Sequence, residues 1–247
     1  MEPRTGAPDR RTCVNHPVGS FCCTPRTARG PLEQLSRSVG APTDAPLPAT
    51  ANALPGGPFR MGTDDAEGYP SDGEGPVREV TVGPFAIDTL TVSNARYAQF
   101  VEATGYVTET EWEYAARGGL EQARFPWGDE LTPGGQHRCN GWKGTAPVDA
   151  YAPNGFGLHN VAGNVWEWCA DWFSATHHLT RTSPADRTNP TGPATGDSRV
   201  MRGGSYLCHA SCCNRYRVAA RTANTPDSAG GNNGFRVVWD LPTGAGR

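Results

Sequence analysis

Three cysteines and a histidine lie close together near the C-terminal end of the chain: Cys208, His209, Cys212 and Cys213. Thiolates are soft ligands, and the pair Cys208 and Cys213 could hold Cu(I) between them. The four side chains together could instead bind Zn²⁺, although adjacent ligands bind one ion awkwardly. A redox dithiol is a third interpretation, although the CxxC spacing is absent, and a buried pair of inert thiols is a fourth. The spacing alone leaves all four open.

A second group of polar residues begins at Asn160 and ends at Glu167. An asparagine, loop carbonyls and a glutamate within so short a segment can surround a hard cation such as Ca²⁺ with oxygen ligands. The alternative is a capped turn whose tryptophans fill the core. The sequence contains nothing that resembles a Ser-His-Asp triad, a P-loop or a dinucleotide-binding fingerprint.

The composition limits what surrounds these residues. Gly and Pro contribute 31 and 22 of the 247 residues, which argues against a helical bundle because neither is well tolerated inside helices. The net charge of −3 gives no electrostatic reason to expect nucleic acid or an anionic membrane as a partner. No apolar run approaches the ~18 residues of a membrane span, and the first residues lack the apolar segment of a signal peptide. We therefore expect a cytoplasmic protein. In a reducing compartment, clustered cysteines such as those at 208–213 are more often ligands or redox centres than disulfide partners.

The pattern along the chain predicts one domain with flexible ends. Residues 1–55 lack apolar periodicity and predict a disordered leader, and residues 241–247 form a tail. Between them, residues 77–82 and 85–88 read as strands, Ser93 is expected to cap a helix, and a second helix over 109–117 ends at Gly118-Gly119. Frequent turn signals after residue 125 predict an α+β domain, irregular and loop-rich, with little regular secondary structure.

Several segments in a fixed order carry a resemblance to a known family. They are RGGSYLCH at 202–209, CNRYRVAAR at 213–221, NTPDS at 224–228 and GFR at 234–236, preceded by TEWEYAARGG at 110–119, GTAPV at 144–148 and GNVWEW at 163–168. Over residues 56–240 the chain resembles the formylglycine-generating enzymes, the sulfatase-modifying factor family. The resemblance implies a single domain of the formylglycine-generating enzyme or C-type-lectin-like type.

The resemblance also implies an activity. Members of this family are copper-dependent oxidases that use O₂ to convert the cysteine of a Cys-Xaa-Pro-Xaa-Arg segment in a type I sulfatase into Cα-formylglycine, with a thiol reductant. By this resemblance Cys208 and Cys213 hold Cu(I) and, with Ser205, are catalytic. Trp166, His209 and Asn232 fall where the family lines its substrate pocket.

The same resemblance assigns a role to the segment from Asn160 to Glu167. Asn160 and Glu167, with the carbonyls of Gly163 and Val165, match a structural Ca²⁺ site of the family.

The chain also departs from the family pattern. Relatives carry a long insert after Thr108 that is missing here, a second gap follows Asn140, and Cys212 stands where relatives usually have tyrosine. The missing segments favour an alternative, namely a catalytically impaired pseudoenzyme or a binding module of the same fold. The sequence does not reveal a role for the N-terminal cysteines, Cys13, Cys22 and Cys23.

Overall fold

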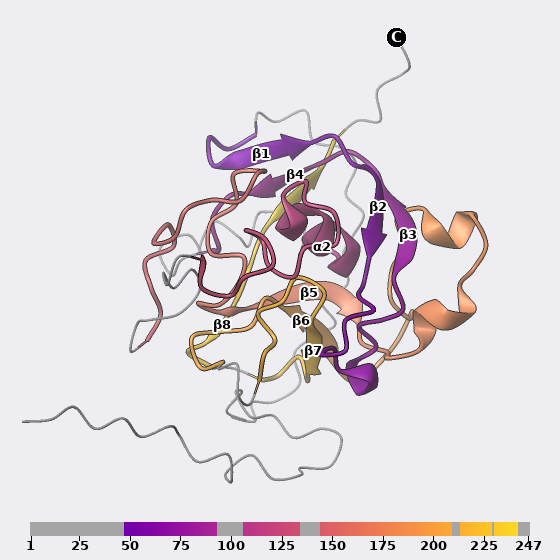
Figure 1. The fold of residues 1–247 in the computed structure, drawn as a ribbon. Coiled ribbons are helices and arrows are strands. Elements are labelled where there is room, and N and C mark those ends of the chain that lie inside the picture. The colour runs from indigo at the N-terminus through magenta and orange to yellow at the C-terminus, as the bar shows by residue number, and fades with distance from the viewer. Residues whose placement is uncertain (1–46, 93–105, 134–143, 209–212, 229, 242–247) are drawn as a thin grey trace, which may run out of the picture.

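A computed structural model describes residues 47–92, 106–133, 144–208, 213–228 and 230–241. Nine short strands, one α-helix and three 3₁₀ turns follow one another in these ranges (Figure 1). In chain order they are β1 (Ala51–Leu54), β2 (Gly57–Met61), η1 (Pro70–Asp72), β3 (Arg78–Val82), β4 (Phe85–Asp88), α2 (Glu109–Arg117), β5 (Trp166–Trp172), η3 (His177–Thr180), η4 (Ala185–Arg187), β6 (Arg199–Arg202), β7 (Arg221–Asn224), β8 (Asn233–Phe235) and β9 (Val238–Asp240).

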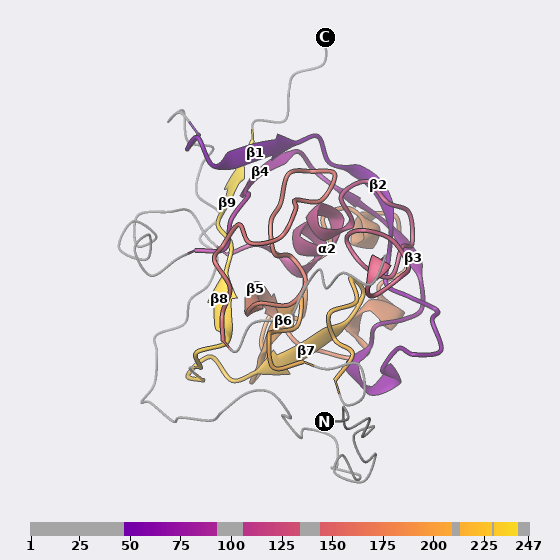
Figure 2. The same ribbon diagram turned by 60° about the vertical axis from the view of Figure 1, so that its left-hand side comes forward.

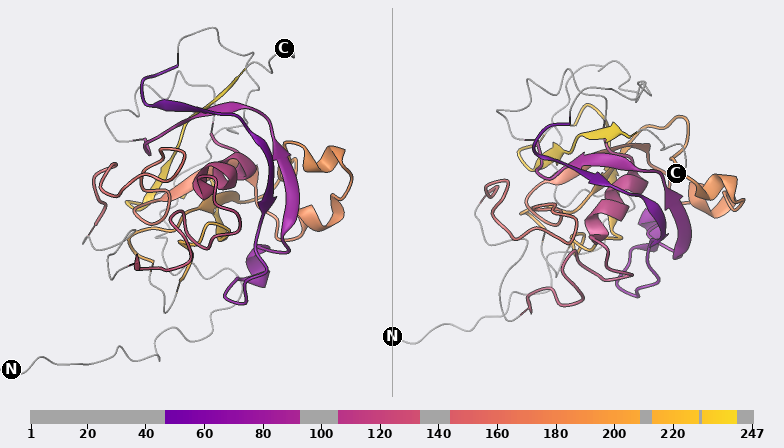
Figure 3. Two further views of the ribbon diagram at one scale, coloured as in Figure 1. Left: turned by 45° about the horizontal axis from the view of Figure 1, so that its top comes forward. Right: turned by 90° about the horizontal axis from the view of Figure 1, so that it is seen from above.

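The strands form three small sheets that surround the helix. The largest has the order β7-β6-β5-β8, with β8 parallel to β5 and the other pairs antiparallel. The order β1-β4-β9 makes a second antiparallel sheet, and β2 and β3 make a two-stranded ribbon. Figure 2 shows α2 between the β1-β4 side and the β5-β6-β7 side of the molecule. The turns η3 and η4 stand at one side, next to β3, as both views of Figure 3 show.

Most elements that the sequence pattern predicts are present. The helix covers Glu109–Arg117, the strand predicted at 77–82 is β3, and the one predicted at 85–88 is β4. This arrangement confirms an α+β domain rich in irregular loops. The helix expected after Ser93 lies outside the described residues. Among the described residues, no helix is long and apolar enough to cross a membrane.

The expected boundary of the N-terminal leader is wrong. Residues 51–54, which were assigned to a disordered leader, form β1 and pair with β4 along its whole length. Leu54 is buried in the core, opposite Phe85. A four-residue strand with two exposed positions carries too little alternation to be recognised in a segment rich in proline. Residues 1–46 and 242–247 lie outside the described ranges.

Helix α2 begins at a complete capping box. The Thr108 hydroxyl accepts a hydrogen bond from the Glu111 amide at 3.3 Å, and the Glu111 carboxylate accepts one from the Thr108 amide at 2.8 Å. Gly118 ends the helix with φ +57°, a left-handed conformation that glycine adopts without steric cost. Local sequence therefore fixes both ends of the helix.

Two apolar clusters make up the core. The first joins Trp112, Ala115 and Ala116 of α2 to side chains from all three sheets. The second lies beyond β5 and β6 and includes Trp166, Met201, Tyr216, Cys208 and Cys213. The cysteine pair is thus part of the packed interior.

A buried ion network ties α2 to the largest sheet. The Glu113 carboxylate has no exposed surface and accepts hydrogen bonds from Arg117 at 2.6 Å and from the Gly62 amide at 2.7 Å. The Arg202 guanidinium of β6 forms an ion pair with the same carboxylate. Burial alone would raise the pKa of Glu113, but the charges of Arg117 and Arg202 outweigh it and lower the pKa to about 2.

Replacement of Glu113 by Gln tests this network. The folded pKa of Glu113 lies below its ordinary value of 4.5, so its contribution to stability is present above about pH 4.5 and is lost as the pH falls towards 2. We expect Glu113→Gln to lower the free energy of unfolding at pH 7 by about 3 kcal/mol, because two buried guanidinium groups lose their counter-charge. The variant should also lose stability less steeply below pH 4.5. Urea unfolding at several pH values measures both effects.

Glu121→Gln is the matched control, since Glu121 pairs with Arg60 at the exposed surface. It should change stability by less than about 1 kcal/mol. Equal effects of the two substitutions would contradict the assignment.

Candidate active site

The two cysteines that the spacing singles out face each other inside the second core cluster. The Sγ atoms of Cys208 and Cys213 lie 2.9 Å apart, and the residues are 3% and 1% exposed. None of the three cysteines that the structure describes forms a disulfide. The third, Cys169, belongs to the first cluster, and burial raises its pKa well above the usual range. Two thiols therefore meet at one shielded point.

Cys208 follows a backbone turn that only glycine can make. Gly203 and Gly204 have φ values of +87° and +71°, in the left-handed region that favours glycine. A Cβ atom on Gly203 would lie 2.7 Å from the Val161 carbonyl oxygen, and one on Gly204 would lie 3.1 Å from the backbone of Arg215. The turn thus packs against the segment that follows Cys213. It aims Cys208 at that segment.

Ser205 closes the turn around Cys208. Its carbonyl accepts a hydrogen bond from the Cys208 amide at 2.9 Å, and its own amide donates to the Cys208 Sγ at 3.4 Å. The Ser205 hydroxyl accepts a hydrogen bond from the Asn232 side chain at 3.2 Å. The Trp166 amide in turn donates to the Asn232 carbonyl at 2.7 Å. Ser205, Asn232 and Trp166 are therefore brought together beside the thiols.

The indole of Trp166 carries a polar group that the fold leaves unsatisfied. Trp166 is 1% exposed, and its Nε1 has no acceptor in the part of the chain that the structure describes. A buried N–H without a partner is costly, so such a group is uncommon unless a ligand or water satisfies it. His209 and Cys212 lie outside the described residues, and the zinc interpretation depends on both of them.

The two side chains assigned to calcium, those of Asn160 and Glu167, already form hydrogen bonds within the protein. The Asn160 side chain accepts a hydrogen bond from the Tyr151 amide at 3.2 Å and donates to the Pro147 carbonyl at 2.7 Å. The Glu167 carboxylate accepts hydrogen bonds from the Trp112 indole at 2.8 Å and the Thr91 hydroxyl at 3.0 Å.

Arg236 completes the surroundings of Glu167. Its Nε donates a hydrogen bond to the Glu167 carboxylate at 2.9 Å, and its Nη2 forms an ion pair with the same carboxylate at 2.9 Å. Arg236 and Glu167 are both fully buried. The four lone-pair sites of a carboxylate are thereby used. As arranged here, the loop does not fit a calcium ion through Glu167 unless one of these donors moves away. The pairing of Glu167 with Arg236 was not predicted, although Arg236 belongs to the GFR segment at 234–236.

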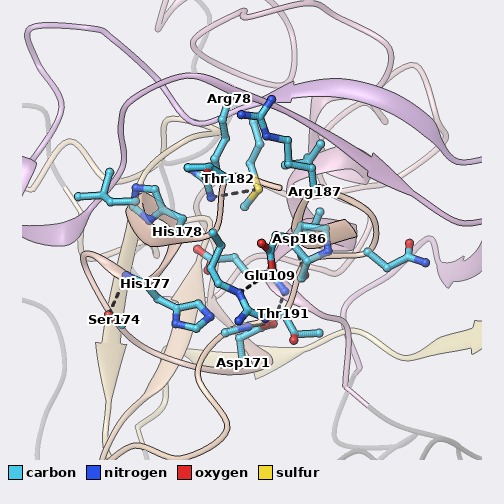
Figure 4. A pocket seen from close by; sticks show the side chains of 18 of the residues that line it. Arg78, Glu109, Asp171, Ser174, His177, His178, Thr182, Asp186, Arg187 and Thr191 are labelled. Atoms are coloured by element: carbon cyan, nitrogen blue, oxygen red, sulfur yellow. Dashed lines mark hydrogen bonds and ion pairs between the residues drawn. The ribbon is translucent and has the colours of Figure 1, made fainter. Parts of the chain in front are cut away.

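A large cavity lies elsewhere in the described parts of the chain. Its volume is about 680 Å³, and β3, the start of α2 and the segment with η3 and η4 line it. In Figure 4 Arg78 and Arg187 lie along the upper part of the view and Asp171 and His177 along the lower part. Burial raises the pKa of Asp171 to about 6, and its carboxylate accepts hydrogen bonds from the Glu109 and Gly192 amides. Of the residues that the sequence assigns to the active site, none of those within the described ranges lines this cavity.

Acidic residues opposite the Cys213 segment are the main feature that sequence reasoning overlooked. Asp72 and Glu74 form ion pairs with Arg215 and Arg217. The signal was present as acidic residues spaced through 64–74 and arginines spaced through 215–221, but nothing in the sequence indicates that the two segments meet.

Comparison with known proteins identifies the same family that the sequence motifs resemble. A family model, the sulfatase-modifying factor enzyme 1-like domain, matches residues 41–110 and 107–241. A formylglycine-generating enzyme from Thermomonospora curvata is 45% identical, with 76% of this chain and 92% of the relative covered. The mouse formylglycine-generating enzyme is 36% identical, with 90% and 86% covered. An inactive Cα-formylglycine-generating enzyme 2 from Bos taurus is 32% identical, with 78% and 88% covered.

A solved structure supports the fold. PvdO from Pseudomonas aeruginosa superimposes with a TM-score of 0.64, at 22% identity, over 77% of this chain and 94% of that one. At this level of identity, the similarity supports the fold alone.

The comparisons also show that relatives contain positions that this chain lacks. The alignment with the Thermomonospora curvata relative runs over 281 residues, more than the 247 of this chain, so the relative has positions without a counterpart here. The two stretches that match the family model meet at residues 107–110, next to Thr108.

The distance between the thiols predicts how they oxidise. We expect a mild thiol oxidant to join Cys208 to Cys213 before Cys169 reacts, because Sγ atoms 2.9 Å apart need only a small shift to form a bond. Cys169 is buried in another cluster, and its raised pKa leaves little thiolate. Peptide mapping of a Cys212→Ala variant after limited oxidation identifies the linked pair without ambiguity from the neighbouring cysteine. Oxidation of Cys169 before the pair would contradict this arrangement.

Proposed function

Because the chain belongs to the sulfatase-modifying factor family, we propose that it converts a cysteine of a sulfatase polypeptide to Cα-formylglycine. The observation that carries this proposal is the pair of shielded thiols 2.9 Å apart, beside Ser205, Asn232 and Trp166. The relatives that bear the name formylglycine-generating enzyme cover most of this chain at 36–45% identity.

We propose Cu(I) as the metal that Cys208 and Cys213 hold. The donor set consists of soft thiols, which suit Cu(I). A four-ligand zinc site would need His209 and Cys212 as well, and both lie outside the described residues. When bound, copper supplies the chemistry that activates O₂.

The protein's own residues would prepare the site for the substrate. The Ser205 amide donates a hydrogen bond to the Cys208 sulfur and so holds it in place. The unsatisfied indole N–H of Trp166 is available to a group of the substrate. The low exposure of both cysteines excludes bulk water from the thiols. The reaction breaks the C–S bond of the substrate cysteine and releases the sulfur as hydrogen sulfide. The substrate carbon gives up two electrons and a thiol reductant supplies two more, so that per O₂ the net products are one aldehyde oxygen and one water.

Calcium is a second proposal for this chain, separate from the reaction. Asn160, the carbonyls of Gly163 and Val165, and Glu167 would be its ligands, provided that Glu167 gives up a bond to Arg236. Metal analysis after dialysis against a calcium chelator, with and without added Ca²⁺, tests it. Stoichiometric calcium that Asn160→Ala abolishes would support the site. The absence of bound calcium would assign Glu167 to the ion pair alone.

A catalytically silent binding module is the second candidate function. It is favoured by the positions of the relatives that have no counterpart here and by a relative whose name describes it as inactive. Such a protein would be folded and would bind a sulfatase-type peptide without producing an aldehyde.

A direct assay separates the two. The reduced, Cu(I)-loaded protein is mixed in air with a thiol reductant and a peptide that contains Cys-Xaa-Pro-Xaa-Arg, and mass spectrometry follows the peptide. We expect the peptide to lose its thiol and gain an aldehyde, with activity reduced at least a hundredfold in Cys208→Ser and Cys213→Ser, because each removes a soft ligand.

Cys169→Ala is the control, since this cysteine is equally buried but lies in the other cluster. It should keep most of the activity. Turnover that survives both active-site substitutions would refute the proposed site. A folded protein that binds the peptide and yields no aldehyde would establish the second candidate.

A further inference from the structure

The segment around η1 lies along the segment that begins with Cys213. Four of its side chains each bind one residue of that segment, and we call them the 67–74 clasp. They are Glu67, Tyr69, Asp72 and Glu74, which contact Asn214, Cys213, Arg215 and Arg217, respectively. Figure 1 shows η1 beside β7, at the same end of the molecule.

The clasp is anchored at its C-terminal end by a buried ion pair. Glu74 and Arg217 are each 2% exposed, and two hydrogen bonds of 2.8 and 3.1 Å join them. Gly73 is held in a left-handed conformation in which a Cβ atom would lie 2.2 Å from the Ala175 carbonyl oxygen. The backbone on this side is therefore fixed, because a buried ion pair is costly to separate.

Tyr69 is the member of the clasp that reaches the site itself. Its hydroxyl donates a hydrogen bond to the Cys213 carbonyl oxygen at 2.8 Å. The guanidinium of Arg215 lies over its ring, 4.2 Å from the centroid, and Asp72 holds that guanidinium through bonds of 2.9 and 2.7 Å. The phenol is thus pinned between a charged group on one side and a peptide oxygen on the other.

The peptide that Tyr69 holds is a strained one. Asn214, the next residue, has φ +44°, a left-handed conformation that costs a non-glycine residue energy. Its side chain donates a hydrogen bond to Glu67 at 2.9 Å. A peptide plane next to such a residue would relax if its contacts were lost, and the orientation of the Cys213 carbonyl sets the ψ angle of Cys213.

We propose that Tyr69 is a positioning residue that fixes the Cys213 sulfur opposite Cys208 by holding the Cys213 carbonyl oxygen. The identity of the bound metal rests on the proposed function, but the positioning of the two thiols does not. Tyr69 touches neither thiol in a reacting role and acts through the backbone.

Tyr69→Phe in the full chain tests the proposal, because it removes the hydroxyl and keeps the ring under Arg215. Two measurements are made: Cu(I) affinity by competition with a chromophoric Cu(I) chelator, and the equilibrium of the Cys208–Cys213 pair with a glutathione redox buffer. We expect Cu(I) affinity to fall about tenfold, the scale of one lost hydrogen bond to an ordered group, and the thiol–disulfide equilibrium to shift about threefold or more.

Tyr114→Phe is the matched control. The Tyr114 hydroxyl also donates to a backbone carbonyl at 2.8 Å, that of Gly56, and it lies in the first cluster away from the thiols. It should lose similar thermal stability but leave both readouts unchanged. Asp72→Asn, which weakens the ion pair that holds Arg215 over Tyr69, should move both readouts in the same direction by a smaller factor and serves if Tyr69→Phe does not fold.

The outcomes separate this proposal from the function. Unchanged Cu(I) affinity and thiol equilibrium in folded Tyr69→Phe would overturn the positioning role, whether or not the protein makes an aldehyde. Equal shifts in Tyr114→Phe would overturn it too, because they would indicate a general loss of stability. If the parent protein binds no Cu(I), the proposed metal fails and the glutathione equilibrium alone decides the role of Tyr69.

Discussion

The fold depends on a small number of charges that are removed from water. Glu113 and Arg202 are both fully buried, and each would destabilise the folded state without the other. Their pairing fixes α2 against β6. Trp112 of the same helix also contacts the sheet, because its indole donates a hydrogen bond to Glu167 of β5. Glu167 in turn forms an ion pair with Arg236. The central helix is thus joined to the sheet by one buried ion pair and by a hydrogen bond to the carboxylate of a second pair, and the apolar clusters pack around them.

The same network sets the position of Cys208. Arg202 donates two further hydrogen bonds, to the carbonyls of Ala219 and Ala220, each at 2.9 Å. It is followed directly by Gly203 and Gly204, which turn the chain toward Cys208. A shift of Arg202 would therefore be transmitted to the thiol through only a few residues. The stability of the core and the geometry of the site cannot be varied independently here.

The backbone and side chains at the start of α2 are engaged in hydrogen bonds and ion pairs. The two stretches that match the family model meet at 107–110, yet Thr108 and Glu111 form a complete capping box across this point. The Glu109 amide donates to Asp171, and the Glu109 carboxylate forms two 2.7 Å hydrogen bonds with Arg221. Exposed helix amides and an unpaired buried carboxylate, which would be the local cost of such a junction, are both avoided.

Sequence patterns predicted those features whose causes are local. Helix α2 carries its cap, its apolar face and its terminal glycines within a dozen residues, and its bounds were predicted correctly. Strand β1 was missed because its stability comes from pairing with β4, some thirty residues later. The Glu167–Arg236 pair and the contacts of Tyr69 with Cys213 join residues far apart in sequence, and no periodicity marks them. The resemblance to a family supplied the cysteine pair but not the contacts that hold it.

The two thiols of the site are supported from different sides of the molecule. Cys208 is positioned by the turn that leaves the buried network, whereas Cys213 begins a segment held by the 67–74 clasp. The supports meet where Gly204 packs against the backbone of Arg215, close enough that a Cβ atom would lie 3.1 Å away. The 2.9 Å separation of the two sulfur atoms depends on this arrangement, because each support restricts one cysteine and their contact fixes the distance between them. The site therefore depends on the relative placement of two segments that are far apart in sequence. For this reason the residue types of the site could be predicted from the sequence, whereas its geometry could not.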